Sequence, residues 1–133
     1  MDHAAPVTRK INDFSLVVTH EPAYVTVIGH GSATLRDFFL GIDVIAVAAA
    51  THADKRVLID LLAVRQSLSF AEHLTLGGRV AERLSFAQRV ATIVPEQYRS
   101  GASEKAAQKS GLVLHAFTKR EEAVAWLVEK DPG

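Results

Sequence analysis

The chain has 133 residues, of which 48% are hydrophobic and 23% are charged. This length and composition are typical of one folded globular domain and exclude a disordered chain. Fifteen basic side chains balance fifteen acidic ones, so no overall positive field is present to gather nucleic acid. The absence of cysteine excludes disulfides, thiolate nucleophiles and cysteine-ligated metal sites.

The lengths of the apolar segments indicate whether the chain has a secretion signal or a membrane-spanning helix. The first ten residues lack the apolar core of a secretion signal. The longest apolar stretch, at about residues 42–50, is much shorter than the ~20 residues of a membrane-spanning helix. We therefore expect a cytoplasmic protein that is not an integral membrane protein. We also expect a single domain over 1–133, with flexible ends at about 1–12 and 130–133.

The first predicted elements in chain order are two strands and a helix. Residues 14–19 alternate apolar and polar side chains, and residues 23–28 are rich in branched and aromatic ones, as strands require. The short gap between them contains a proline and predicts an antiparallel hairpin. Residues 35–51 place apolar side chains at helical spacing, and Thr34 with Asp37 forms a variant of the capping box.

Strands and helices alternate through the remainder of the sequence. The expected strands are 56–62, 88–94 and 112–117, and the expected helices are 69–84, 102–110 and 118–127, the last opened by a capping box at Thr118-Lys-Arg-Glu121. Each strand-helix-strand crossover returns the chain in the same direction. The sequence therefore predicts an α/β fold, in which a five-stranded mixed sheet begins with an antiparallel hairpin and continues with parallel strands, covered by four helices.

The glycine-containing segment Gly29-His-Gly-Ser-Ala-Thr34 lies between a predicted strand and a predicted helix, where backbone N–H groups can face a phosphate. It lacks the third glycine of a dinucleotide fingerprint, and we interpret it as a sharp turn. Gly77-Gly78, inside the predicted amphipathic helix, costs about 1 kcal/mol per glycine relative to alanine. We expect close packing of Gly77 against the sheet to compensate, in preference to a flat docking surface.

Catalytic and metal-binding patterns are weak throughout the sequence. None of the six histidines belongs to a recognisable zinc motif. The G-x-S-x-G elbow of a serine hydrolase is missing, and no pair of side chains suggests acid–base catalysis. We therefore expect no cofactor, no metal and no catalytic residue, and interpret the protein as a non-enzyme.

Three passages together resemble the SpoIIAA-like branch of the STAS (sulfate transporter and anti-sigma factor antagonist) superfamily. They are Arg56-Val-Leu-Ile-Asp-Leu-Leu62, Gln88-Arg-Val-Ala-Thr-Ile-Val-Pro95, and Glu104-Lys-Ala-Ala-Gln-Lys-Ser-Gly111 followed by His115-Ala-Phe-Thr-Lys-Arg-Glu-Glu-Ala-Val-Ala-Trp-Leu127. The resemblance covers most of the chain from Tyr24 onward. It implies a small mixed sheet covered by four helices, in agreement with the pattern of elements.

The resemblance also directs attention to the loop after residues 56–62. In anti-sigma factor antagonists of this superfamily, that loop carries a D-S-S-G-L type sequence whose serine is phosphorylated to release a partner. Ser69 falls near that serine, but Leu68 stands where the acidic residue would be. Ser69-Phe-Ala-Glu72 is also a capping box, which we favour as its role. Ser69 stays a candidate phosphorylation site, because a phosphate is tolerated at a helix N-terminus.

Our leading hypothesis is a non-enzymatic STAS-like regulatory or interaction domain that binds a protein or a small ligand. Open sheets bind at the C-terminal ends of their parallel strands, where neighbouring connections diverge. The residues that we expect at this site are His30, Ser32, Arg65, Ser67 and Ser69. No nucleic acid is expected as a partner.

Two other hypotheses remain open. A lipid or a small anion could occupy a cavity lined by Phe38, Phe39 and Phe70, since some sequences of this branch are similar to lipid-carrier domains. An enzyme is the third reading, because a fold alone does not decide function. The sequence also leaves open a homodimer, and it does not show which group pairs with Asp60 inside its predicted strand.

Overall fold

The structure is a computed structural model that describes residues 5–98 and 101–130. These residues form one mixed sheet of six strands in the order β1-β2-β3-β4-β5-β6. The strands are β1 (Val7–Ile11), β2 (Phe14–His20), β3 (Val25–Ser32), β4 (Arg56–Arg65), β5 (Arg89–Ile93) and β6 (Leu114–Phe117). Strand β2 is antiparallel to both of its neighbours, β1 and β3, whereas β4, β5 and β6 run parallel to β3.

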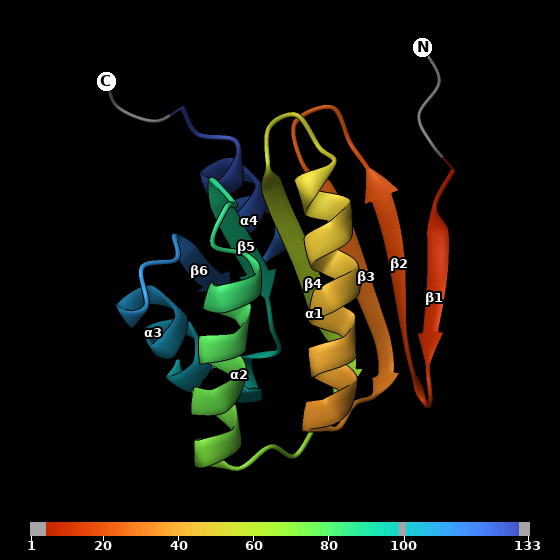
Figure 1. The fold of residues 1–133 in the computed structure, drawn as a ribbon, viewed down its shortest axis with the longest axis vertical. Helices are drawn as coiled ribbons and strands as arrows, with labels where there is room; N and C mark the ends of the chain where they lie inside the picture. The colour runs from red at the N-terminus through yellow and green to blue at the C-terminus, as the bar shows by residue number, and fades with distance from the viewer. Residues whose placement is uncertain (1–4, 99–100, 131–133) are drawn as a thin grey trace.

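Helices cover both faces of the sheet, but unequally (Figure 1). Their bounds are α1 (Leu35–Ala50), α2 (Phe70–Arg83), α3 (Ala102–Lys109) and α4 (Arg120–Leu127), and a 3-10 helix spans Glu96–Tyr98. The crossover helices α1, α2 and α3 share one face, because successive crossovers of one hand that advance in one direction place their helices on the same side. Helix α4 packs on the other face, against β4, β5 and β6. No helix among the described residues combines the length and the apolar character that spanning a membrane requires.

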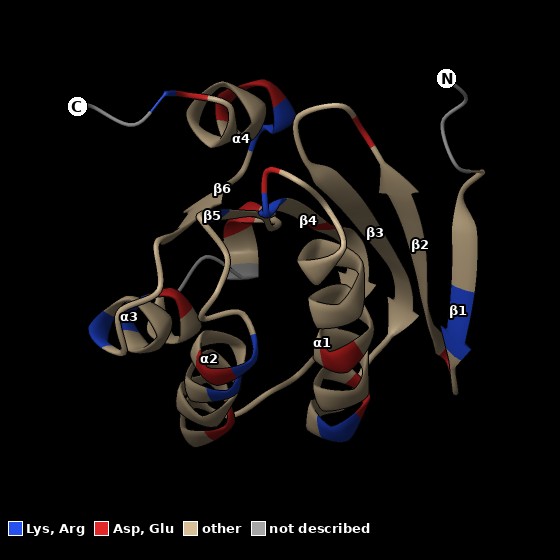
Figure 2. Cartoon of the chain, turned by 45° about the horizontal axis from the view of Figure 1, so that its top comes forward, with Lys and Arg blue, Asp and Glu red and all other residues tan. Residues whose placement is uncertain are grey.

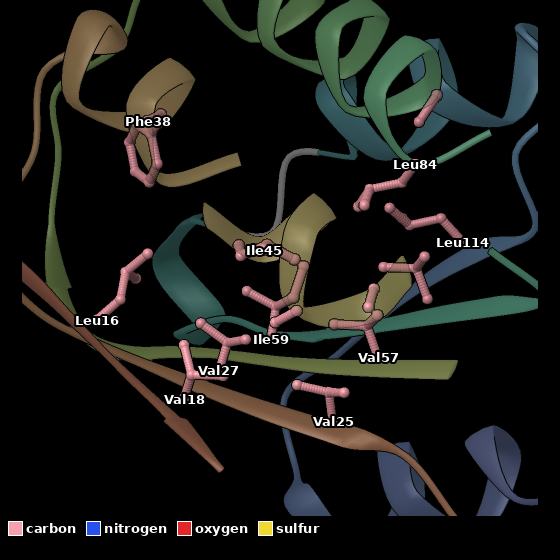
Figure 3. Close-up of a cluster of buried hydrophobic side chains, with 14 of the residues drawn as sticks. Leu16, Val18, Val25, Val27, Phe38, Ile45, Val57, Ile59, Leu84 and Leu114 are labelled. Carbon is pink, nitrogen blue, oxygen red and sulfur yellow. The ribbon is translucent and has the colours of Figure 1, made fainter. Parts of the chain in front are cut away.

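The main hydrophobic core lies between the sheet and the three crossover helices (Figure 3). Successive side chains of a strand point to opposite faces, so alternate residues supply this core. Its members from the strands include Phe14, Leu16, Val18, Val25, Val27, Val57, Ile59, Val90 and Leu114. A second, smaller cluster lies under α4, where Ala123 and Leu127 pack against Leu58, Ala91 and Ile93.

The N-terminal part of the sheet differs from the sequence prediction. Residues 7–11, which we assigned to a flexible end, form a strand, β1, that pairs with β2. The sheet therefore has six strands and not five. The turn between them contains Asn12 at a φ of 55°, a left-handed conformation that asparagine adopts more readily than most residues. Strand β1 presents the adjacent cations Arg9 and Lys10 at the sheet edge (Figure 2), and such charges oppose unwanted edge pairing.

The predicted glycine-rich turn is also wrong, because residues 29–32 continue β3. Gly31 has a φ of +97°, and a Cβ atom there would lie 2.0 Å from the backbone oxygen of Asp13. Glycine is therefore required for close passage of β3 past the β1–β2 turn rather than for a phosphate-binding turn.

Two of the three predicted helix caps are present. Both the Thr34 and the Ser69 capping boxes form, with reciprocal bonds to Asp37 and Glu72. The box at Thr118 does not form: α4 begins at Arg120, and its N-cap Lys119 makes no side-chain cap bond. Thr118 and Lys119 form the bend between β6 and α4, so the helix begins one residue later than the motif requires.

Polar side chains hold the C-terminal end of α4. Arg89, only 7% exposed, donates to the carbonyl oxygen of Trp126 at 2.6 Å and lies over its ring at 5.0 Å. Arg56 donates to the carbonyl oxygens of Leu127 and Glu129 at 2.6 and 2.7 Å. These bonds satisfy carbonyls that a helix C-terminus leaves free, and the cations complement the helix dipole.

Helix α3 covers the outer edge of β6. Glu104 accepts a hydrogen bond from the backbone N–H of Ala116 at 2.9 Å. One turn later Gln108 donates to the carbonyl oxygen of Leu114 at 2.7 Å. The two side chains replace the partners that a neighbouring strand would offer, which closes this edge of the sheet.

Candidate functional site

Strands β3 and β4 end side by side and bring three of the predicted site residues together. His30 is paired in register with Ala63, and Ser32 with Arg65. The backbone N–H of Ala33 donates to the carbonyl oxygen of Arg65 at 3.0 Å, which fixes the two strand ends. His30, Ser32 and Arg65 are all exposed.

The last residues of β4 and the connection to α2, together called the β4–α2 loop (Val64 to Ser69), alternate between an inner and an outer set of side chains. Val64, Gln66 and Leu68 point inward and line a cavity. The intervening Arg65, Ser67 and Ser69 are exposed. The sequence prediction named the outer set and missed the inner one, although the alternation is visible in the sequence as an extended segment of period two.

Ser69 is the N-cap of α2. Its Oγ accepts from the backbone N–H of Glu72 at 3.1 Å, and the Glu72 carboxylate accepts from the backbone N–H of Ser69 at 2.9 Å. The side chain nevertheless lies on the surface. Capping therefore explains why a serine suits this position, while the hydroxyl stays within reach of solvent.

The cavity lies between the sheet and the crossover helices and has two adjoining compartments. One, of about 80 Å³, is nearest the β4–α2 loop, and the other, of about 120 Å³, extends under α2 and α3. Both compartments are lined by Leu61, Leu76, Val94 and Ser103, so these four residues form their common wall.

The cavity differs from the one that the lipid hypothesis assumed. Of the three phenylalanines that we placed around it, only Phe38 contributes to its lining. Phe39 lies under the guanidinium of Arg79, 4.9 Å from the ring centroid, and Phe70 is 70% exposed. Each compartment is also far smaller than the roughly 300–1,000 Å³ of ordinary ligand pockets.

A polar pair from two helices stands at the loop side of this cavity. Nδ1 of His73 on α2 and Oγ of Ser103 on α3 are 3.4 Å apart. Gly77 makes their approach close, because a Cβ atom at this position would lie 2.4 Å from the backbone oxygen of Ser103. Gly77 thus packs against α3 and not against the sheet as predicted.

We missed both members of this pair. The polar residues around His73 in the sequence favour an exposed side chain at this position, whereas His73 is half-buried. Position 73 is four residues before Gly77 and therefore on the same helix face. That spacing was the signal that could have located His73 at the α2–α3 contact.

Asp60 points to the opposite face of the sheet and lies outside this site. One carboxylate oxygen accepts from the backbone N–H of Leu62 at 3.0 Å, and the other accepts from Arg120 of α4 at 3.2 Å. The pairing register of β4 shifts at this point, next to Ile28 and His30 of β3. Asp60 therefore satisfies the irregular backbone of a bulge and ties α4 to the sheet.

Asp37 fastens the β1–β2 turn to the start of α1. Its carboxylate accepts from the backbone N–H of Thr34 at 3.0 Å and from the side chain of Asn12 at 2.9 Å. These hydrogen bonds, in that order of importance, lower the pKa of Asp37 below its ordinary value of 3.8. Among the described residues, no group of three His, Asp or Glu side chains is arranged to hold a metal ion.

The sequence and the fold were compared with those of known proteins. No protein-family model and no curated protein matches the sequence. The chain is similar to a crystal structure of an uncharacterised protein of the DUF3478 family, with a SpoIIAA-like fold, from Shewanella loihica PV-4. The two are 21% identical over 96% of each chain, with a TM-score of 0.51.

The fold is SpoIIAA-like. The sequence prediction of a mixed sheet of this type with four helices is confirmed for the described residues, with six strands in place of five. At this level of identity the similarity establishes the SpoIIAA-like architecture and leaves binding to be argued from the side chains.

Proposed function

We propose that this protein is a non-enzymatic regulatory domain that binds a partner protein at the C-terminal ends of β3 and β4. The observation that supports this function is the outward display of Arg65, Ser67 and Ser69 along one extended loop. Hydrogen-bond donors held on an open surface suit recognition of another protein.

An apolar anchor lies next in the chain. Phe70 and Leu74, four residues apart on α2, are 70% and 42% exposed. Residues at this spacing share one side of a helix. An exposed aromatic side chain and an exposed arginine, Phe70 and Arg65, lie five positions apart in the sequence, and interface hot spots are enriched in both residue types.

The test is a pull-down from a lysate of the source organism, using Arg65→Ala and Phe70→Ala variants. The matched control is Val47→Ala, because Val47 is 69% exposed on α1 and lies away from this loop. Proteins captured by the wild type are identified by mass spectrometry, and their affinity for each variant is then measured with purified components. We expect at least one variant to weaken the affinity about tenfold or more, the range of interface hot spots. Equal affinity of wild type, control and both variants would refute this surface.

Variants of Ser69 test whether a negative charge regulates that binding. Ser69→Asn keeps an N-cap residue without a phosphate acceptor, and Ser69→Asp keeps the cap and adds a charge. Regulation by charge predicts that only the aspartate variant releases the partner. Release by both variants would instead show that the serine itself makes the contact.

A further inference from the structure

We propose that the cavity under α2 and α3 binds a compact apolar or aromatic molecule that carries one hydrogen-bonding group. We further propose that its occupancy is transmitted to the outer residues of the β4–α2 loop, a second step that rests on the proposed function. Ligand binding would thus control the conformation of the surface that the partner protein contacts.

The size and lining of the cavity define the apolar part of the ligand. An apolar protein cavity of about 150 Å³ is known to stay dry and to bind benzene. The larger compartment here measures about 120 Å³, and the smaller one, about 80 Å³, adjoins it. Ile45, Ile59 and Val80 are among the aliphatic side chains around the larger compartment. One ring or a short branched chain fits this space, whereas a lipid chain does not.

The lining of the larger compartment also includes Thr92 and Glu104, but polar residues make up a greater share of the smaller compartment and define the remainder of the ligand. His73, Ser103 and Gln66 all line it. Within the described part of the chain, Nε2 of His73 and the amide nitrogen of Gln66 have no hydrogen-bond partner. A hydroxyl or carbonyl on the ligand would find its partner here, while the apolar part would enter the larger compartment.

The loop provides the coupling between the cavity and the surface. Gln66 and Leu68 line the cavity, and their neighbours Arg65, Ser67 and Ser69 are exposed. In an extended segment, displacement of one side chain moves the backbone that carries the side chains on the opposite face. Gln66 also accepts from the backbone N–H of Leu68 at 2.7 Å. A ligand group that recruits Gln66 would therefore change the hydrogen bonding of the loop.

Benzene and phenol serve as the two probes, because they differ only in the hydroxyl group. We expect both to raise the melting temperature of the protein, since a ligand that binds only the folded state stabilises it. Phenol should bind about threefold to tenfold more tightly, as expected for one added hydrogen bond. Failure of both probes to bind would overturn the site.

Three variants locate the binding. Val94→Phe places a larger side chain in the wall common to both compartments. It should fill the space there and abolish binding of both probes. Val47→Phe makes the same change on the exposed surface of α1 and should leave binding intact. His73→Leu should remove the advantage of phenol while retaining benzene. Unchanged binding to Val94→Phe would show that the probes bind elsewhere, and an unchanged phenol advantage in His73→Leu would overturn the polar assignment.

Coupling is read from backbone amide resonances in NMR spectra. Saturation with phenol should shift the amides of Arg65, Ser67 and Ser69, and those shifts should disappear in Val94→Phe. Shifts confined to Leu61, Leu76 and their neighbours in the core would overturn the coupling. Failure of this coupling can be distinguished from failure of the proposed function, because the pull-down with Arg65→Ala is done without benzene or phenol.

Discussion

The two faces of the sheet are covered by different physical means. On one face, α1, α2 and α3 cover the larger hydrophobic core and, with the sheet, line the cavity. On the other face, the single helix α4 buries a small apolar cluster and is held by Arg56, Arg89 and Arg120. The first layer depends mainly on apolar contacts, and the second depends on directed polar bonds.

This difference separates a part of the molecule that can adjust from a part that is fixed. Apolar contacts have no preferred direction, so α1 and α2 can shift around a ligand, while the hydrogen bonds of Glu104 and Gln108 hold α3 to β6. The bonds to α4 have defined donors and acceptors and fail together if the helix moves. The cavity and the β4–α2 loop both belong to the adjustable side.

Replacement of Arg89 should produce the largest loss of stability. Arg89→Met keeps much of the apolar volume but removes the donor to Trp126 and the contact with its ring. A buried hydrogen bond from a charged group and a desolvated cation–π contact together predict a loss of about 2–4 kcal/mol in the free energy of unfolding. Urea unfolding checks the value, and emission from Trp126, the only tryptophan in the chain, should shift to the red if α4 detaches.

Arg120→Met provides the matched control for Arg89. It also ties α4 to the sheet, but its side chain is 43% exposed in the pair with Asp60. We expect a loss of only about 1 kcal/mol or less. Equal losses from the two variants would contradict the view that buried bonds to the C-terminal end of α4 dominate its attachment.

The adjacent glycines of α2 give the next largest effect, on the other side of the sheet. Gly77→Ala would place a Cβ atom 2.7 Å from the Cβ of Ala106 and still closer to the backbone of Ser103. Such overpacking should cost about 1–3 kcal/mol in the free energy of unfolding. At Gly78 a Cβ atom meets nothing within 4 Å, so Gly78→Ala should stabilise by about 0.5–1 kcal/mol. A gain in thermal stability from both substitutions would show that the α2–α3 contact is not close-packed.

Local patterns in the sequence were sufficient to predict most of the fold. The period of apolar residues located α1 and α2, alanine-rich composition located α3, a capping motif with inward apolar residues located α4, and the apolar run in 56–62 located the central strand β4. The capping boxes at Thr34 and Ser69 form because every atom that they require lies within four residues. These features depend on short-range geometry, which the sequence specifies directly.

The remaining features depend on residues far apart in the sequence. Asp60 is paired with Arg120, and no local pattern can identify a partner sixty residues away. His73 meets Ser103 only because α2 and α3 pack together. Strand β1 was different, since Asn12 and Asp13 are residues that favour turns and stand between two short runs, a local signal that we did not use.

Asp37 should produce the smallest effect, which depends on pH. It is the buried carboxylate of the adjustable side, 5% exposed, and hydrogen bonds from Thr34 and Asn12 lower its pKa below 3.8. A carboxyl whose pKa is lower in the folded state contributes stability above its unfolded pKa, and this contribution is lost as the pH falls through the folded value. Asp37→Asn should therefore lower the free energy of unfolding at neutral pH, and the difference from wild type should shrink below pH 3.8. Urea unfolding across this pH range checks the prediction, with Asp54→Asn at an exposed position as the control. A difference that stays constant with pH would mean that Asp37 contributes through the shape of its side chain and not through its charge.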